Sequence, residues 1–187
     1  MLRRRLAGAM VVVGCMSGAA GMLEAQGTAL PTIPLDKVRR SQEAMVMQRV
    51  ANTDLTITYS RPAARGRELF GALVPWGRVW HPGADQATAI AITRDITISG
   101  QPLAAGKYSL WTVPTAETWT IIFSSAADVF HTPYPGQARD VLRLTVTPEA
   151  VPHTELLTWD FPLVDGKDTT LRLRWGTVGL SMPVVVP

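Results

Sequence analysis

Apolar residues along most of this chain recur at every second position, which is the period of a β-strand whose two faces meet different surroundings. Leu55, Ile57 and Tyr59 face one way, and the threonines between them face the other. A matching run at residues 44–50 and a turn-like cluster at 51–54 predict that these two runs form a β-hairpin.

Further strand-like segments follow, separated by Gly, Pro and Asp-Gly turn signals. They are residues 88–93, 96–99, 108–113, 119–124, 141–147, 156–161, 170–175 and 178–185. No amphipathic helical run of ten or more residues lies between them, so the pattern predicts an all-β fold, a single antiparallel β-sandwich or a barrel-like variant of one. The alternation predicts a core of Leu55, Ile57, Ile90, Leu110, Ile121, Phe123, Leu142, Leu144, Leu171 and Leu173.

The first twenty residues have the pattern of an export signal. Three arginines at positions 3–5 precede an uncharged run from Leu6 to Ala20, and that run is too short and too rich in Gly for a membrane span of about 20 apolar residues. The expected organisation is a signal peptide at 1–25, a flexible tether at 26–40 and one β-sandwich domain at 41–187.

A second processing route is open, because Val12-Val-Gly-Cys15 resembles a bacterial lipobox, in which the cysteine is lipidated. Both routes predict an exported protein, periplasmic or extracellular. Only the lipobox route attaches it to a membrane, through a lipid anchor at Cys15. Cys15 is also the only cysteine, so the domain has no internal disulfide, no cysteine-based zinc site and no cysteine nucleophile.

Net charge gives no support for nucleic-acid binding. Without residues 1–25 the chain carries 15 basic and 14 acidic side chains, whereas binding to nucleic acid needs a concentrated basic face.

The long segment between the hairpin and the next strand is the best candidate for a binding site. It spans about 25 residues, is rich in Arg, Trp, Gly and Pro, and has no clear periodicity, which is typical of an ordered functional loop. The candidate binding residues are Arg61, Arg65, Arg67, Trp76, Trp80, His81 and Asp85.

Each residue type in this loop has two interpretations. Clustered arginines bind carboxylates or phosphates, or they pair with acids such as Glu68 and Asp85, or cap loop carbonyls. Trp76 and Trp80 stack on flat ligands or pack in the core. If Trp80 and His81 form a binding surface, replacing them with Ala leaves stability nearly unchanged, whereas burial makes the same changes costly.

The other four tryptophans lie within strand-like runs and are predicted to be core residues. They are Trp111, Trp119, Trp159 and Trp175.

Neither a metal site nor a catalytic constellation is complete. His81 and Asp85 lie four residues apart and His131 is distant in the sequence, while a metal needs three or four convergent ligands. No Gly-x-Ser-x-Gly elbow accompanies the serines. We therefore predict no metal and no cofactor, and a non-catalytic module that binds a small ligand, a glycan or an envelope protein. The alternatives are a hydrolase that uses His81, Asp85 and the loop arginines, and a structural lipoprotein domain anchored at Cys15.

Several segments in one order resemble a bacterial family, domain of unknown function 2911, over roughly residues 40–185. They are Tyr59-Ser-Arg-Pro62, Gly66-Arg67, Phe70-Gly71, Leu73-Val-Pro-Trp-Gly77, Val79-Trp80, Gly83-Ala84, Ala105-Gly-Lys-Tyr-Ser-Leu110, Trp119-Thr-Ile-Ile-Phe123 and Asp140-Val-Leu-Arg143. The resemblance implies an exported bacterial setting and no established activity. In the family pattern an Arg commonly follows the second Trp and an Asn follows Gly-Ala, where this chain has His81 and Asp85. A His/Asp site would thus not be shared by the family.

Overall fold

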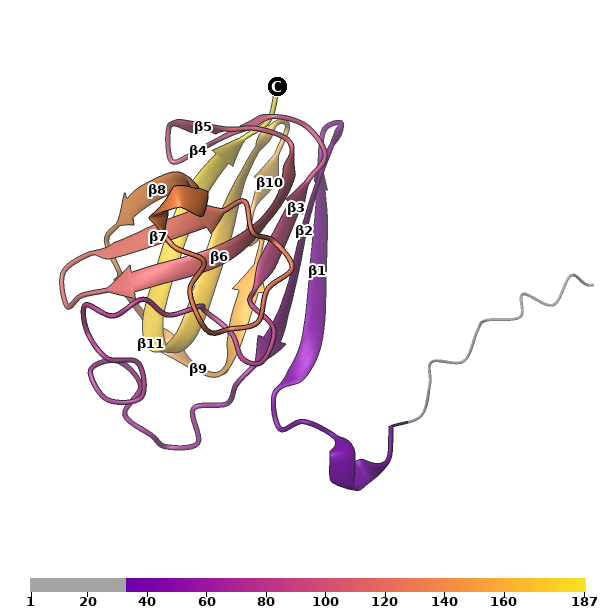
Figure 1. The fold of residues 1–187 in the computed structure, drawn as a ribbon. Helices are drawn as coiled ribbons and strands as arrows, with labels where there is room; N and C mark the ends of the chain where they lie inside the picture. The colour runs from indigo at the N-terminus through magenta and orange to yellow at the C-terminus, as the bar shows by residue number, and fades with distance from the viewer. Residues whose placement is uncertain (1–32) are drawn as a thin grey trace, which may run out of the picture. The chain divides into compact units, whose positions relative to one another are not determined.

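The computed structural model describes residues 33–187, of which Leu35–Pro187 form one unit. The expected signal peptide and the lipidation site at Cys15 lie outside the described residues. Within residues 35–187 the chain forms eleven strands and two short 3₁₀ helices, η1 (Leu35–Lys37) and η2 (Gln137–Arg139), with no α-helix (Figure 1). The predicted all-β class is confirmed. Neither of the two short helices described is long and apolar enough to cross a membrane.

The first sheet is antiparallel and has six strands in the order β1-β2-β3-β6-β7-β8. These are β1 (Gln42–Val50), β2 (Thr53–Arg61), β3 (Ala89–Ile92), β6 (Gly106–Pro114), β7 (Trp119–Ser124) and β8 (Asp140–Val146). The predicted hairpin is β1-β2, in which Val50 pairs with Thr53. Ala51 makes the tight connection with a left-handed φ of 48°.

The second sheet has the order β10-β11-β4-β5, and β9 also pairs with β11. Its strands are β4 (Ile96–Ile98), β5 (Gln101–Leu103), β9 (Glu149–Asp160), β10 (Val164–Asp165) and β11 (Asp168–Val185).

Two sequence-based boundaries in this sheet were wrong. Residues 170–175 and 178–185 were predicted as separate strands, but β11 runs through both, and Gly176 with a φ of 57° sits where its register with β9 shifts. A glycine that signals a turn here supplies the left-handed conformation of a bulge. The interval between the predicted strands at 96–99 and 108–113 also contains a strand that the pattern missed, β5, whose Gln101 and Pro102 pair with β4.

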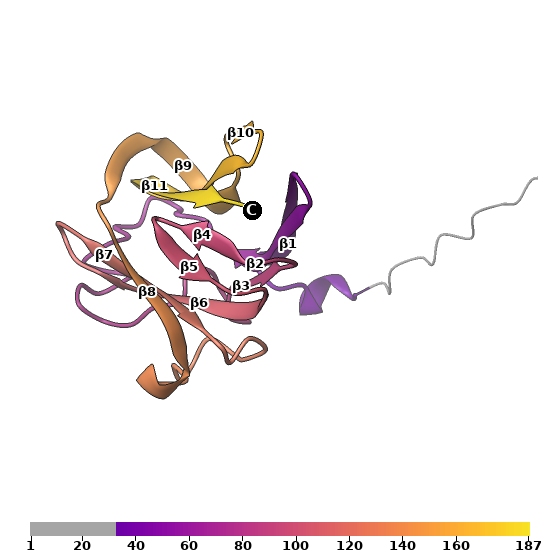
Figure 2. The ribbon, with the colours of Figure 1, turned by 90° about the horizontal axis from the view of Figure 1, so that it is seen from above.

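The core lies between the two sheets, which face each other as a sandwich and remain separate rather than closing into a barrel (Figure 2). Of the ten predicted core residues, nine are buried, and Leu142 is half-buried against the same cluster. Burial of Trp119, Trp159 and Trp175 in this core confirms their prediction.

Trp111 is also buried, but on the opposite face of the first sheet. There it forms a second, smaller cluster with Ala87 and Ile122, against which Val129 and Tyr134 pack. The segment between β7 and β8 therefore covers part of the outer face of this sheet. As a result, β6 has apolar side chains on both faces.

Residues 62–88 form the long loop between β2 and β3, and isolated backbone bridges fix it to three other parts of the fold (Figure 1). The bridging pairs are Ala63 with Leu156 of β9, Trp80 with Thr112 of β6, and Gln86 with Phe130 of the β7-β8 segment. Trp80 and Thr112 exchange two backbone hydrogen bonds of 2.8 and 2.7 Å. The loop is irregular but held by its backbone, as the sequence predicted for an ordered loop.

Candidate functional site

A cavity of about 530 Å³ lies along the long loop, and we call it the arginine cavity. Its lining consists of Arg40, Ser41, Pro62, Ala63, Arg65, Arg67, Leu73, Val74, Val79, Trp80, His81, Gly83, Ala84, Asp85, His131, Thr132 and Trp175. Five of the seven residues predicted as a site are in this set, namely Arg65, Arg67, Trp80, His81 and Asp85. Arg61 and Trp76 are not.

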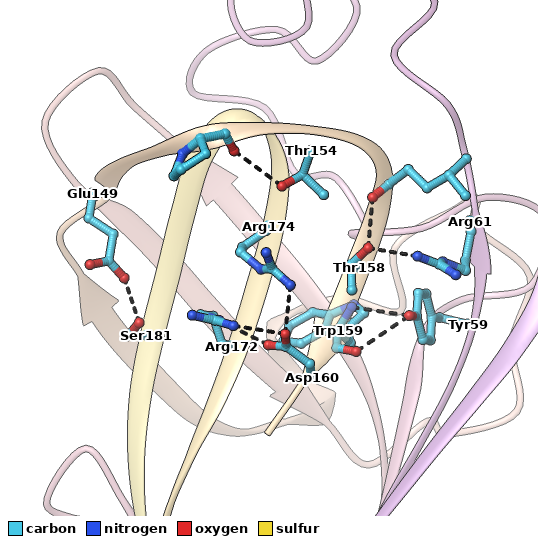
Figure 3. Close-up of polar contacts among 12 residues, drawn as sticks. Tyr59, Arg61, Glu149, Thr154, Thr158, Trp159, Asp160, Arg172, Arg174 and Ser181 are labelled. Atoms are coloured by element: carbon cyan, nitrogen blue, oxygen red, sulfur yellow. Dashed lines mark hydrogen bonds and ion pairs between the residues drawn. The ribbon is translucent and has the colours of Figure 1, made fainter. Parts of the chain in front are cut away.

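Arg61 is held by a neighbouring strand instead. Its Nε donates to the Leu157 carbonyl oxygen at 3.1 Å. Its Nη2 donates to the Thr158 hydroxyl at 2.8 Å (Figure 3). These bonds join the end of β2 in the first sheet to β9 in the second. The structure thus separates Arg61 from the other loop arginines, because its guanidinium is bonded to β9 and does not line the cavity.

Arg65 and Arg67 present their charges differently. Arg67 caps the loop, donating from Nε to the Ala64 carbonyl at 3.0 Å and from Nη2 to the Ala63 carbonyl at 2.6 Å. The backbone N–H of Arg65 donates to Glu155 Oε1 at 2.8 Å, while its guanidinium forms no ion pair with any described residue. The capping interpretation is therefore correct for Arg67, and Arg65 keeps its charged group toward solvent and the cavity.

His81 is buried, with 5% of its surface exposed, and its Nδ1 has no hydrogen-bond partner among residues 33–187. Its ring stacks on that of His131 and meets Trp111 edge-on. Burial, and secondarily the charge that His131 can carry, lower the pKa of His81 to about 4. His81 is therefore a neutral imidazole at pH 7, able to exchange hydrogen bonds but not to supply charge.

His131 is oriented by the backbone of Asp85. Its backbone N–H donates to the Asp85 carbonyl oxygen at 3.1 Å, and its Nδ1 lies 3.0 Å from the same oxygen. Since a carbonyl only accepts, Nδ1 carries the proton of this hydrogen bond.

The carboxylate of Asp85 makes an ion pair with Arg39 at 3.1 Å, from Oδ1 to Nη1. No hydrogen bond joins this carboxylate to His81 or to His131 in the part of the chain that the structure describes. A hydrolytic His–carboxylate pair would need such a bond. Within residues 33–187 no three His, Cys, Asp or Glu side chains form a group that could hold a metal ion.

Aromatic side chains form the wall of the cavity toward the core. Trp80 and Trp175 stack with ring centroids 6.0 Å apart and planes inclined by 15°, and Trp80 meets Trp119 edge-on. Trp80 is half-buried and packs against the core, whereas Trp76 is 44% exposed and lies in a different groove. The two loop tryptophans thus have different roles, which their sequence context did not separate.

Sequence reasoning missed some members of the cavity. Arg40 and Ser41 line it from the start of the domain, although residues 26–40 were expected to be a tether, and Trp175 reaches it from β11. The adjacent arginines 39 and 40 directly before the first strand were the available signal. Nothing in the local sequence of Trp175 distinguishes it from the other strand tryptophans.

The fold and cavity define an antiparallel two-sheet β-sandwich protein with a ligand-sized, arginine-lined cavity at a long loop. The family model described as "protein of unknown function (DUF2911)" matches residues 41–184, and the chain belongs to this family. No curated protein matches the chain, and no solved structure does.

Proposed function

We propose that this protein is a binding module whose arginine cavity holds a small organic anion, a carboxylate or a phosphate ester with a flat apolar part. The observation that carries the proposal is the placement of Arg40, Arg65 and Arg67 around one cavity that also contains stacked Trp80 and Trp175.

Charge is the first argument. Three arginines line the cavity with a single acid, Asp85, and that acid is already paired with Arg39 from outside the lining. The lining therefore has an excess of positive charge. Guanidinium groups bind carboxylate and phosphate oxygens through paired hydrogen bonds.

Preorganisation is the second argument. The carbonyls of Ala63 and Ala64 fix the guanidinium of Arg67 by two of its five N–H donors, and the remaining donors stay available. A side chain that is already ordered loses less conformational entropy when it binds.

Shape and polarity are the third argument. A volume of about 530 Å³ falls within the usual range of small-molecule sites, about 300–1,000 Å³. Leu73, Val74 and Val79 add apolar surface beside the two tryptophans. Neutral His81 and the ring of His131 provide hydrogen-bonding groups without adding a carboxylate that would repel an anion.

The hydrolase alternative has less support, because the Asp85 carboxylate binds Arg39 rather than a histidine.

We further propose that the module is exported, to the periplasm or beyond, with residues 1–25 as its signal peptide and lipidation at Cys15 as the alternative. The support is the sequence pattern of those residues and the setting that the family resemblance implies.

Calorimetric titration with phenyl phosphate, benzoate and uncharged benzyl alcohol tests the anion site. The two anions are expected to bind more tightly than the alcohol, and Arg65→Ala and Arg67→Ala are each expected to weaken them about tenfold, the loss of one charge-assisted contact. Arg94→Ala, at an exposed position between β3 and β4, is the matched control and should have no effect. Equal binding of all three probes, or equal affinity in the Arg65 and Arg94 variants, would contradict the proposal.

A further inference from the structure

A second groove, of about 440 Å³, lies on another part of the same loop, and we call it the aromatic groove. Phe70 and Trp76 of the loop line it together with His153 of β9 and Thr177 of β11. It is separate from the arginine cavity, although Arg67 borders both.

The indole ring of Trp76 is exposed and yet held in one orientation. It stacks on Phe70 with centroids 6.2 Å apart and planes inclined by 29°, and Phe70 packs edge-on against buried Trp119 at 4.9 Å. The Nε1 edge of the ring lies against Gly71, where an added Cβ would come within 2.6 Å of Trp76 Nε1. Gly71 also has a left-handed φ of 94°, so this position requires glycine for both conformation and space.

Polar side chains surround this aromatic face. Glu68, His153 and Thr177 line the same groove, and Glu68 forms no ion pair with any described residue. His153 Nε2 lies 3.1 Å from Glu155 Oε2, which leaves its other ring nitrogen available. The groove therefore combines one flat apolar surface with a rim of hydrogen-bond donors and acceptors.

We propose that the aromatic groove is a saccharide-binding subsite, in which a neutral pyranose ring stacks on Trp76 and its hydroxyls bond to Glu68, His153 and Thr177. A pyranose has one face of C–H groups bordered by hydroxyls, and this amphipathic shape fits a flat aromatic surface with a polar rim. A lipid chain would leave the polar rim desolvated, and because Glu68 offsets the charge of Arg67 the lining has no excess of positive charge for an anion. This subsite does not depend on the anion proposed for the arginine cavity.

The test is a titration of the purified protein with cellohexaose, xylohexaose and chitohexaose, in which binding is measured by calorimetry and by tryptophan fluorescence. At least one is expected to bind, with affinity reduced about tenfold or more in Trp76→Ala and largely retained in Trp76→Phe, which keeps a flat ring. Leu163→Ala is the matched control, since Leu163 is 59% exposed in the β9–β10 connection and lines neither site. Arg65→Ala should also leave saccharide binding unchanged, which separates this subsite from the anion site.

A chemical measurement on the wild-type chain avoids any loss of folding in the variants. Trp76 is the most exposed of the six tryptophans, so N-bromosuccinimide should oxidise it first, and bound saccharide should slow this oxidation. If none of the three oligosaccharides binds at concentrations up to about 10 mM, which corresponds to a very weak affinity, the proposal is overturned. Binding that neither protects Trp76 nor weakens in Trp76→Ala overturns it as well.

Discussion

The imidazole rings of His81 and His131 stack with their centroids 5.5 Å apart and their planes inclined by 28°. One ring belongs to the long loop and the other to the segment that covers the outer face of the first sheet. The backbone bridge between Gln86 and Phe130 joins the same two segments. The histidine pair therefore marks the place where two irregular segments meet to form one side of the arginine cavity.

Burial of His81 predicts a dependence of stability on pH. Its pKa is about 4 in the folded protein and 6.5 as an unperturbed group, so the unfolded chain binds more protons between these values. The stability contributed by neutral His81 is present above pH 6.5 and is lost as the pH falls through about 4. The loss should reach roughly 2–4 kcal/mol at about 1.4 kcal/mol per unit of pKa difference.

Urea unfolding of the wild type and of His81→Gln across this range measures the effect. The difference in unfolding free energy between the wild type and the variant should shrink as the pH falls, because Gln does not titrate. A His81 imidazole that titrates near 6.5 in an NMR experiment would contradict this assignment.

Arg61→Ala should destabilise the fold, whereas Arg65→Ala should not. Arg61 makes two charge-assisted bonds to β9, and their loss is expected to lower the free energy of unfolding by about 1–3 kcal/mol. Arg65 is exposed and its guanidinium has no described partner, so its replacement should stay within about 0.5 kcal/mol. Chemical denaturation of the two variants compares them directly, and equal losses would contradict the separate roles.

Trp80→Ala should also lower stability, which changes the interpretation of any binding data on that variant. The ring stacks on Trp175 and packs against the core, so a cost of about 2–3 kcal/mol is expected for this half-buried side chain. Trp80→Phe keeps an aromatic wall and should lose less. Thermal melts should therefore place Trp80→Phe between the wild type and Trp80→Ala. A Trp80→Ala variant as stable as the wild type would show instead that this ring is a free binding surface.

Asp160 joins two arginines of β11 on the outer face of the second sheet. Arg172 donates to both of its carboxylate oxygens at 2.9 Å, and Arg174 donates to Oδ2 at 2.7 Å (Figure 3). Burial raises the pKa of Asp160, but the hydrogen bond from Arg172 and the charge of Arg174 outweigh it and hold the pKa below its ordinary value.

Asp160→Asn is therefore expected to cost about 1–3 kcal/mol at neutral pH, the range for hydrogen bonds to charged groups. The wild-type advantage should be present above about pH 3.8, the ordinary value, and be lost as the pH falls through the lower folded-state pKa. Glu149→Gln, at an exposed carboxylate bonded only to Ser181, is the control and should change stability less in the same unfolding experiment. An advantage that persists in strong acid would mean that packing rather than charge holds Asp160.

The period-two pattern was sufficient to predict the strands and most of the core residues, because a strand with one face in the core must place alternate side chains there. It also marked the long loop, where that alternation stops. It was not sufficient for Gly176, since a glycine is equally compatible with a turn that ends a strand and with a bulge inside one. Only pairing with β9 decides between them.

The sequence alone thus determined the fold class, the family and the loop that borders the two cavities, since these follow from local patterns of apolar, turn-forming and motif residues. Tertiary structure decided which side chains meet. It moved Arg61 to a strand junction, placed Trp80 and Trp76 in different sites, and brought Arg40, His131 and Trp175 to one cavity from three distant segments. The physical reason is that contact between distant segments depends on how the two sheets pack and how the loop is bonded to them, and no local pattern along the chain encodes either.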